Sequence, residues 1–140
     1  MSDNSTPGFT ASESEALADL TAGLISEGWA DFVTIERLLS EWITLAQAGD
    51  RYQFSVDDYA NDLTSRDGLE LVLRRCQPPL KAKLLSYIEL ADQEFARRTK
   101  SDDQEVLAQF FRIDARDGWW WKRIPSDGPL AHYLEEDHRA

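Results

Sequence analysis

Apolar side chains recur at every third or fourth position along most of the chain, the spacing that places them on one face of an α-helix. A capping box at Ser12 and Glu15 predicts the start of a first helix, which Gly28 ends. Asp31 is the expected N-cap of a second helix, which Gly49 ends. This second helix carries the clearest apolar stripe, formed by Phe32, Ile35, Leu38, Leu39, Trp42, Ile43, Leu45 and Ala46.

Further helical segments are expected beyond residue 54. The pattern predicts a short helix over 55–68, closed by an Asp-Gly pair, and a second short helix over 69–76. A proline in its first turn suits the longest helix, which we expect over 79–99. Asp102 or Asp103 is expected to cap one more apolar segment.

Between residues 111 and 124 the apolar period shortens toward that of a strand. One interpretation is a β-hairpin with a type I′ turn at Asp117-Gly118, a turn that needs positive φ. In that hairpin Trp120 points toward the helices. The other interpretation extends a helix through Ala115 and leaves the tryptophans as a strap across the bundle. The outer face of the hairpin would hold Trp119, Trp121, Arg112, Arg116 and Arg123.

The sequence as a whole predicts an all-α fold. We expect a compact bundle of about five to seven helices, with a small β-hairpin or Trp-bearing strap near the C-terminus. A mobile N-terminal tail is expected over 1–11, a single helical domain over 12–136 and a frayed C-terminus over 137–140. Trp42 is expected in the core because it lies on the strongest apolar stripe.

Charge is distributed unevenly along the chain. Residues 1–68 carry thirteen Asp and Glu against three Arg, a balance of −10, whereas residues 69–140 carry thirteen acids against twelve Lys and Arg. A negative field of this kind attracts basic proteins and repels nucleic acid and anionic membranes. We therefore expect a basic protein partner, no nucleic acid and no membrane.

Composition favours a folded cytoplasmic protein. Hydrophobic residues make up 42% of the chain, which is enough for a real core. A lone cysteine, Cys76, excludes an internal disulfide, fits a reducing compartment and is expected to be a small buried hydrophobe. The N-terminus has no signal-peptide pattern, and no apolar run approaches the ~20 residues of a membrane span. The oligomeric state is not indicated.

The densest group of reactive side chains is an acidic segment over 57–67. Asp58 and Asp62 lie four residues apart on one helix face, with Arg66 one turn further. We take this segment as a candidate contact surface for a partner. Its polar members are Asp57, Asp58, Asn61, Asp62, Arg66 and Asp67.

A metal site at Asp58 and Asp62 is a weaker interpretation of the same segment. Paired carboxylates can hold a divalent cation, but no second acidic helix offers matching ligands, and the spacing is not that of a calcium loop. The preferred interpretation is structural: acids in the first turn complement the helix dipole, and Asp62 pairs with Arg66.

No motif for catalysis or cofactor binding stands out. Both histidines, His132 and His138, lie in the last nine residues, and the sequence contains no phosphate-binding loop, nucleophile elbow or zinc-ligand spacing. We therefore assign no catalytic residue and no cofactor.

Three consecutive tryptophans, followed by Lys122 and Arg123, form a second candidate contact surface. Adjacent side chains on a strand point to opposite faces, so at least one tryptophan is hard to bury. Exposed Trp beside cations is typical of interaction hot spots and of single-stranded nucleic-acid platforms, and the overall acidity argues against the latter. The alternative is that the tryptophans cover the bundle core, with arginine stems laid over them.

Three segments of the chain together resemble short uncharacterised proteins from bacterial genomes. The resemblance implies no activity and no site residue. The size and acidity of the chain are also similar to those of bacterial immunity proteins, which neutralise basic toxins, although this is a likeness of type and not of motif. The resembling segments are Gly28–Val33, Asp57–Leu63 with Arg66-Asp67, and Trp119–Pro125.

These observations favour a non-enzymatic binding protein that recognises a basic partner, such as a toxin of the immunity type. Two alternatives stay open: an enzyme or enzyme accessory that holds a divalent cation at the acidic segment, and a structural or oligomeric adaptor that uses the tryptophans. The expected contact residues are those of the acidic segment together with Trp119, Trp121, Lys122 and Arg123.

Overall fold

The structure, a computed structural model, describes residues 9–29, 34–103, 105–110 and 118–139, the last four of these by backbone alone. The described part is mainly helical and has a small two-stranded antiparallel sheet and a Trp-containing 3-10 helix near the C-terminus, which confirms the expected fold class. Its elements are α1 Ala11–Ser26, α2 Ile35–Ala48, α3 Val56–Arg75, α4 Pro78–Arg98, β1 Thr99–Ser101, the 3-10 helices η1 Leu107–Gln109 and η3 Trp119–Lys122, β2 Arg123–Pro125 and α5 Pro129–Arg139.

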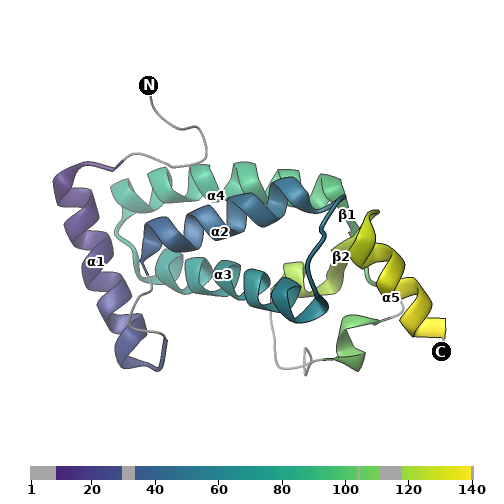
Figure 1. The fold of residues 1–140 in the computed structure, drawn as a ribbon. Coiled ribbons are helices and arrows are strands. Elements are labelled where there is room, and N and C mark those ends of the chain that lie inside the picture. The colour runs from purple at the N-terminus through teal and green to yellow at the C-terminus, as the bar shows by residue number, and fades with distance from the viewer. Residues whose placement is uncertain (1–8, 30–33, 104, 111–117, 140) are drawn as a thin grey trace.

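Helices α2, α3 and α4 lie side by side and form the body of the molecule (Figure 1). α1 crosses one end of this layer, where Glu13 and Glu27 pair with Lys83 of α4 and Arg75 of α3, each at 2.8 Å. α5 and the strands lie at the opposite end (Figure 1). The two ends of the layer are thus covered by different elements.

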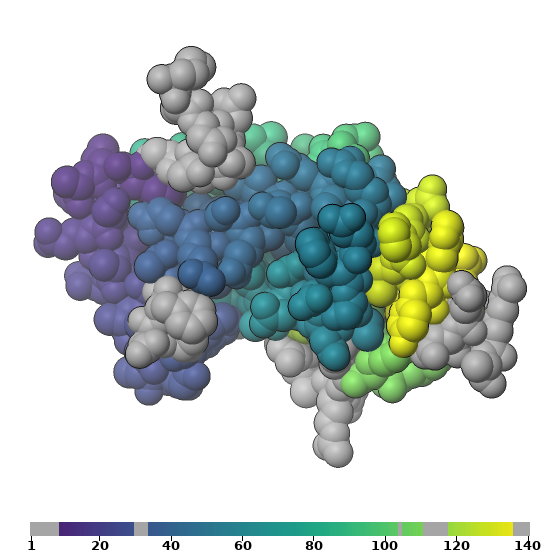
Figure 2. Space-filling model, viewed as in Figure 1, coloured from purple at the N-terminus to yellow at the C-terminus, as the bar shows by residue number. Residues whose placement is uncertain are grey.

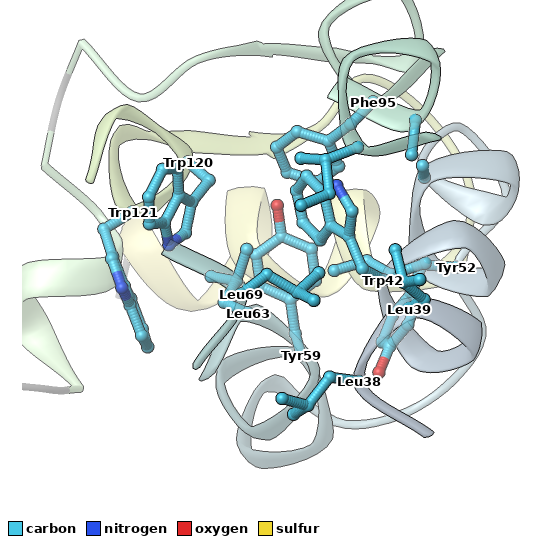
Figure 3. Close-up of a cluster of buried hydrophobic side chains, with 14 of the residues drawn as sticks. Leu38, Leu39, Trp42, Tyr52, Tyr59, Leu63, Leu69, Phe95, Trp120 and Trp121 are labelled. Carbon is cyan, nitrogen blue, oxygen red and sulfur yellow. The ribbon is translucent and has the colours of Figure 1, made fainter. Parts of the chain in front are cut away.

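The core lies along α2, whose apolar stripe faces both α3 and α4. Trp42 is fully buried and packs against Phe95 of α4, with ring centroids 4.7 Å apart (Figure 3). Its indole Nε1 donates a hydrogen bond to Asp92 Oδ1 at 3.0 Å, so the one polar atom of the ring has a partner. The expectation that Trp42 is a core residue is confirmed.

The first two helices begin at other residues than the sequence suggested. The capping box of α1 is Thr10 with Glu13, not Ser12 with Glu15: Thr10 Oγ1 accepts from Glu13 N at 3.2 Å and Glu13 Oε1 accepts from Thr10 N at 2.8 Å. Thr34 is the N-cap of α2, and Asp31 lies outside the described residues. A Thr or Ser two or three positions away satisfies the same capping rule, so spacing alone does not choose between them.

α3 runs unbroken through Gly68, where the sequence predicted a break between two short helices. The reason is packing against distant residues. A Cβ at position 68 would come within 3.0 Å of the side chains of Leu38 and Trp29, so the glycine lets these side chains approach the helix. Cys76 ends α3 as a buried free thiol, and burial raises its pKa.

The C-terminal sheet forms from other residues than expected. β1 pairs with β2, with Lys100 opposite Ile124. The first strand of the expected hairpin and part of its turn, residues 111–117, lie outside the described part of the chain. Gly118 has φ −72°, so the positive-φ turn predicted at Asp117-Gly118 is wrong, and the tryptophans form η3 and not a strand. The expected cap is Asp102 or Asp103, but the N-cap residue of η1 is Val106; the Asp102 carboxylate accepts from Val106 N and Leu107 N at 2.8 and 3.0 Å.

The described chain begins at Phe9, whose ring packs edge-on against the Tyr87 ring with centroids 5.8 Å apart. Residues 1–8 lie outside the described chain. The mobility expected for 1–11 and 137–140 remains a prediction.

Within the residues that the structure describes, no helix is both long and apolar enough to cross a membrane.

Candidate partner-binding site

α3 carries most of the residues predicted to bind a partner and divides them into two groups. Asp57, Asp58 and Asn61 in its first turns are exposed, and Asp62 is half-buried. Arg66, one turn further, is 5% exposed, and other elements cover α3 around this residue. The predicted site is therefore split along the helix.

The exposed group begins at the N-terminus of α3, which Ser55 caps. Ser55 Oγ accepts from Asp58 N at 3.1 Å and donates to Asp58 Oδ2 at 2.9 Å. Two acids in the first turn, Asp57 and Asp58, lie where the helix dipole favours negative charge. This local arrangement explains why the acids are tolerated together, and it fixes Asp58 beside Asp62.

A pocket of about 240 Å³ lies between α2 and the start of α3. Leu45 and Ala48 of α2 supply apolar wall, Asp62 contributes a carboxylate, and Tyr52 and Phe54 come from the connecting loop. We call this the Phe54 pocket. The Phe54 ring is 58% exposed and stands edge-on to Tyr52, with centroids 5.6 Å apart.

The loop that carries the Phe54 pocket is held by the neighbouring C-terminal helix. Leu130 N of α5 donates to Tyr52 O at 3.1 Å, and Figure 2 shows the loop after α2 beside the yellow α5. A Cβ at Gly128 would lie 2.7 Å from Arg51 Cα, so this close approach requires glycine, which also has φ +96°. The aromatic wall of the pocket is thereby fixed to the C-terminal helix.

Asp62 is the electrostatic centre of the Phe54 pocket. Its Oδ2 accepts from the Tyr52 hydroxyl at 2.7 Å. Burial raises the pKa of Asp62, and the nearby carboxylates Glu41 and Asp58 raise it further, although the Tyr52 hydrogen bond acts in the opposite direction. Burial also raises the pKa of Tyr52, which stays a neutral donor. None of the ion pairs found among the described residues neutralises Asp62.

The predicted Asp62–Arg66 pair is wrong because Arg66 turns to other carboxylates. Its Nε and Nη2 donate to the two oxygens of Asp92, both at 2.9 Å, and Nη1 donates to Glu70 at 3.0 Å. The guanidinium carbon lies 4.3 Å from the centroid of the Trp120 ring. Burial lowers the pKa of Arg66, but Asp92 and Glu70 raise it by more. Arg66 is therefore a core residue and not a contact residue.

Asp67 and Trp121, also expected at a contact surface, belong to the same buried region. Asp67 Oδ1 accepts from Trp120 Nε1 at 2.8 Å and from Trp121 Nε1 at 2.9 Å. Trp120 and Trp121 are only 4% and 2% exposed (Figure 3). The expectation that Trp121 shares an outer face with Trp119 is thus wrong, because both indole N–H groups find their acceptor on α3.

Of the remaining predicted contact residues, Trp119 and Lys122 are exposed and Arg123 is tied to the backbone. Trp119 is 40% exposed, with its ring 5.9 Å from Phe95. Arg123 donates to Thr99 Oγ1 and Thr99 O at 2.8 Å, which holds β2 to the end of α4. The other arginines of the expected face, Arg112 and Arg116, lie outside the described residues.

The geometry does not favour the metal alternative. Asp58 and Asp62 have separate partners, Ser55 and Tyr52. Across the described ranges, no three His, Cys, Asp or Glu side chains come together as a metal site would require.

Sequence reasoning missed Phe54, Tyr52 and Glu41 as members of the candidate site. The available signal was an aromatic pair in a short polar loop, at 52 and 54, directly before a helix cap. Glu41 had no signal, because its position beside Asp62 depends on how α2 packs against α3. Comparison of the chain with protein-family models, curated proteins and solved structures finds no match.

Proposed function

We propose that this chain is a non-enzymatic, acidic binding protein of the cytoplasm that recognises a basic protein partner, in the manner of immunity proteins that neutralise basic toxins. The contact surface is the exposed start of α3 with the Phe54 pocket. Its charge comes from Asp57, Asp58 and Asp62, together with Glu41, which pairs with Arg37 at 3.3 Å. The support is physical, since the comparisons contribute nothing to it.

The observation that carries the proposal is the environment of Asp62. A half-buried carboxylate next to two like charges is costly for the isolated protein, as the raised pKa of Asp62 records. A cation brought by a partner would offset that cost and would gain from the lower local dielectric. Titratable groups in costly environments next to a pocket are typical of functional sites.

The exposed Phe54 ring adds a second argument. An aromatic side chain that is 58% exposed loses much of its hydrophobic stabilisation in the free protein. Aromatic anchors of this kind, surrounded by polar groups, supply much of the energy of protein interfaces. Charge around the pocket would steer the partner, and Phe54 would hold it.

The adaptor alternative rests on Trp119. Its ring is 40% exposed, and Lys122, three residues later on a 3-10 helix, projects from the same side. The enzyme alternative draws no comparable support, because Arg66 and Asp67 are occupied by core contacts.

Affinity capture from the native lysate at low and high salt, with two charge-reversed variants, tests the proposal. The site variant replaces Asp57, Asp58 and Asp62 with Lys. The control replaces three exposed acids on other surfaces, Glu15, Glu89 and Glu135, and changes the net charge equally. Circular dichroism checks that both fold.

We expect a basic partner that is released at high salt and that the site variant no longer captures. Its association rate with the control should fall only modestly, through the change in net charge. Equal losses in the two variants, or capture of an acidic partner, would contradict the proposed surface.

A further inference from the structure

We propose that the Phe54 pocket receives one arginine side chain of the basic partner, with its guanidinium on Asp62 and against the Phe54 ring. This inference rests on the proposed function and names the group that the partner must present. Four features of the pocket support it: its size, its free carboxylate oxygen, its aromatic wall and the position of its own arginine.

The size of the pocket fits a single side chain. Pockets for small-molecule ligands commonly measure about 300–1,000 Å³. The Phe54 pocket, at about 240 Å³, is below this range. Leu45 and Ala48 line it with apolar surface, which suits the methylene stem of a long cationic side chain.

The Asp62 carboxylate of the pocket can accept hydrogen bonds from an incoming side chain. Tyr52 uses Asp62 Oδ2, and no hydrogen bond from the described residues reaches Oδ1. An ionised carboxylate can accept about four hydrogen bonds, so both oxygens retain capacity for a forked donor. A guanidinium has two parallel N–H groups, and each can donate a hydrogen bond to one oxygen of a carboxylate.

The aromatic wall favours arginine over lysine. The Phe54 ring stands edge-on to Tyr52, at an interplanar angle of 76°, and is 58% exposed. A planar, weakly hydrated guanidinium stacks on an exposed ring, whereas an ammonium remains strongly hydrated and makes no planar contact.

Arg51 lies at the pocket rim but does not fill it. Its side chain is 68% exposed, and its ion pair with Asp50 measures 3.9 Å. Arg51 therefore competes only weakly for Asp62. Removing it takes away a like charge and should strengthen the binding of an incoming arginine.

The test is a titration of the ¹⁵N-labelled full chain, followed by heteronuclear NMR, with N-acetyl-arginine amide. The matched probes are N-acetyl-citrulline amide, which has nearly the same shape without charge, and N-acetyl-lysine amide. With the arginine probe, we expect chemical-shift changes that saturate at millimolar probe concentrations. These changes should be confined to residues 44–54 and the first turns of α3. The citrulline probe should cause none, and lysine should bind several-fold more weakly.

Three variants locate the interaction. Asp62→Asn keeps an acceptor for Tyr52 but removes the charge, and should weaken arginine binding about tenfold. Glu89→Gln, a control that removes one exposed charge from α4, should change it by less than about twofold. Arg51→Ala should leave binding intact or tighten it.

Equal binding of citrulline or lysine, or an Asp62→Asn variant that binds as the parent does, would overturn the inference. The result is separable from the proposed function. If the basic partner is captured through the acidic surface but the arginine probe does not bind, only the pocket assignment fails. If the probe binds but no basic partner is captured, only the proposed function fails.

Discussion

Asp62 and Asp67 lie five residues apart on α3, and their surroundings differ completely. Asp67 accepts hydrogen bonds from two buried indole N–H groups, at 2.8 and 2.9 Å. Asp62 accepts one, from a neutral phenol, and has Glu41 and Asp58 for neighbours. The same residue type is therefore structural where donors are built around it, and we propose that it binds a partner where they are not.

The difference arises from what covers each end of α3. The second half meets α4 and η3, which bring Asp92 and the tryptophans to Arg66 and Asp67. The first half meets α2, a short loop that leaves Phe54 exposed, and β2, where the Tyr59 hydroxyl donates to Arg123 O at 2.8 Å. The Arg66 charge is neutralised within the fold by Asp92 and Glu70, whereas no ion pair among the described residues neutralises Asp62.

The largest effect should follow removal of the charge at the covered end. Arg66→Ala leaves Asp92 without its bidentate partner and exposes the Trp120 ring to a cavity, so we expect a loss of about 3–5 kcal/mol in the free energy of unfolding. Chemical denaturation measures it. Arg74→Ala, which removes an exposed 3.6 Å pair with Glu70, is the control and should cost less than about 0.5 kcal/mol. Similar losses of unfolding free energy in Arg66→Ala and Arg74→Ala would contradict the distinction between buried and exposed charges on α3.

The next largest effect should be the difference in stability between alanine variants of Trp120 and Trp119. Trp120→Ala removes a buried ring and a hydrogen bond to Asp67, and should cost about 3–4 kcal/mol. Trp119→Ala, at a ring that is 40% exposed, should cost about 1 kcal/mol or less. Thermal melts of both variants provide the comparison, and a larger loss for Trp119 would reverse the assignment of the two rings.

Asp67→Ala should have an intermediate effect. It leaves the indole N–H groups of Trp120 and Trp121 without their shared acceptor, and we expect a loss of about 2–3 kcal/mol. Asp67→Asn keeps an acceptor oxygen and should cost about 1 kcal/mol or less. Equal stability of the Ala variant and the parent in urea denaturation would show that these hydrogen bonds contribute little.

The parts of the fold that could be predicted are those encoded by local pattern. The stripe on α2, with Trp42 at its centre, and the proline start of α4 depend only on neighbours in sequence. Gly68 misled the prediction because a glycine after an aspartate is usually a stop, and only the distant Trp29 and Leu38 explain it. A local rule was overridden there by packing.

The candidate site could be predicted only in part, for a related reason. The acidic segment was visible, but Arg66 prefers Asp92, 26 residues away, over Asp62 at the favourable helical spacing. Trp120 and Trp121 find Asp67 across 53 and 54 residues. No periodic signal marks such pairs, and none marks Phe54, whose exposure depends on the path of a loop.

The smallest effect on stability is expected at the open end. The raised pKa of Asp62 means that its ionisation opposes folding: the contribution of Asp62 to the stability of the parent should fall as the pH rises from 3.8, the ordinary value, through the folded-state pKa. Asp62→Asn lacks this loss, so the stability of the variant relative to the parent should increase over that range. Denaturation at several pH values tests the sign, and a variant that becomes less stable than the parent with rising pH would contradict it.

The most direct test of the division of α3 is the affinity of the captured basic partner for Asp62→Asn and Asp67→Asn, measured side by side. Both variants lose one charge and keep an acceptor oxygen. We expect Asp62→Asn to weaken the complex about tenfold with a melting temperature no lower than that of the parent, and Asp67→Asn to bind as the parent does. Equal weakening by the two substitutions, or an effect of Asp67→Asn alone, would contradict it.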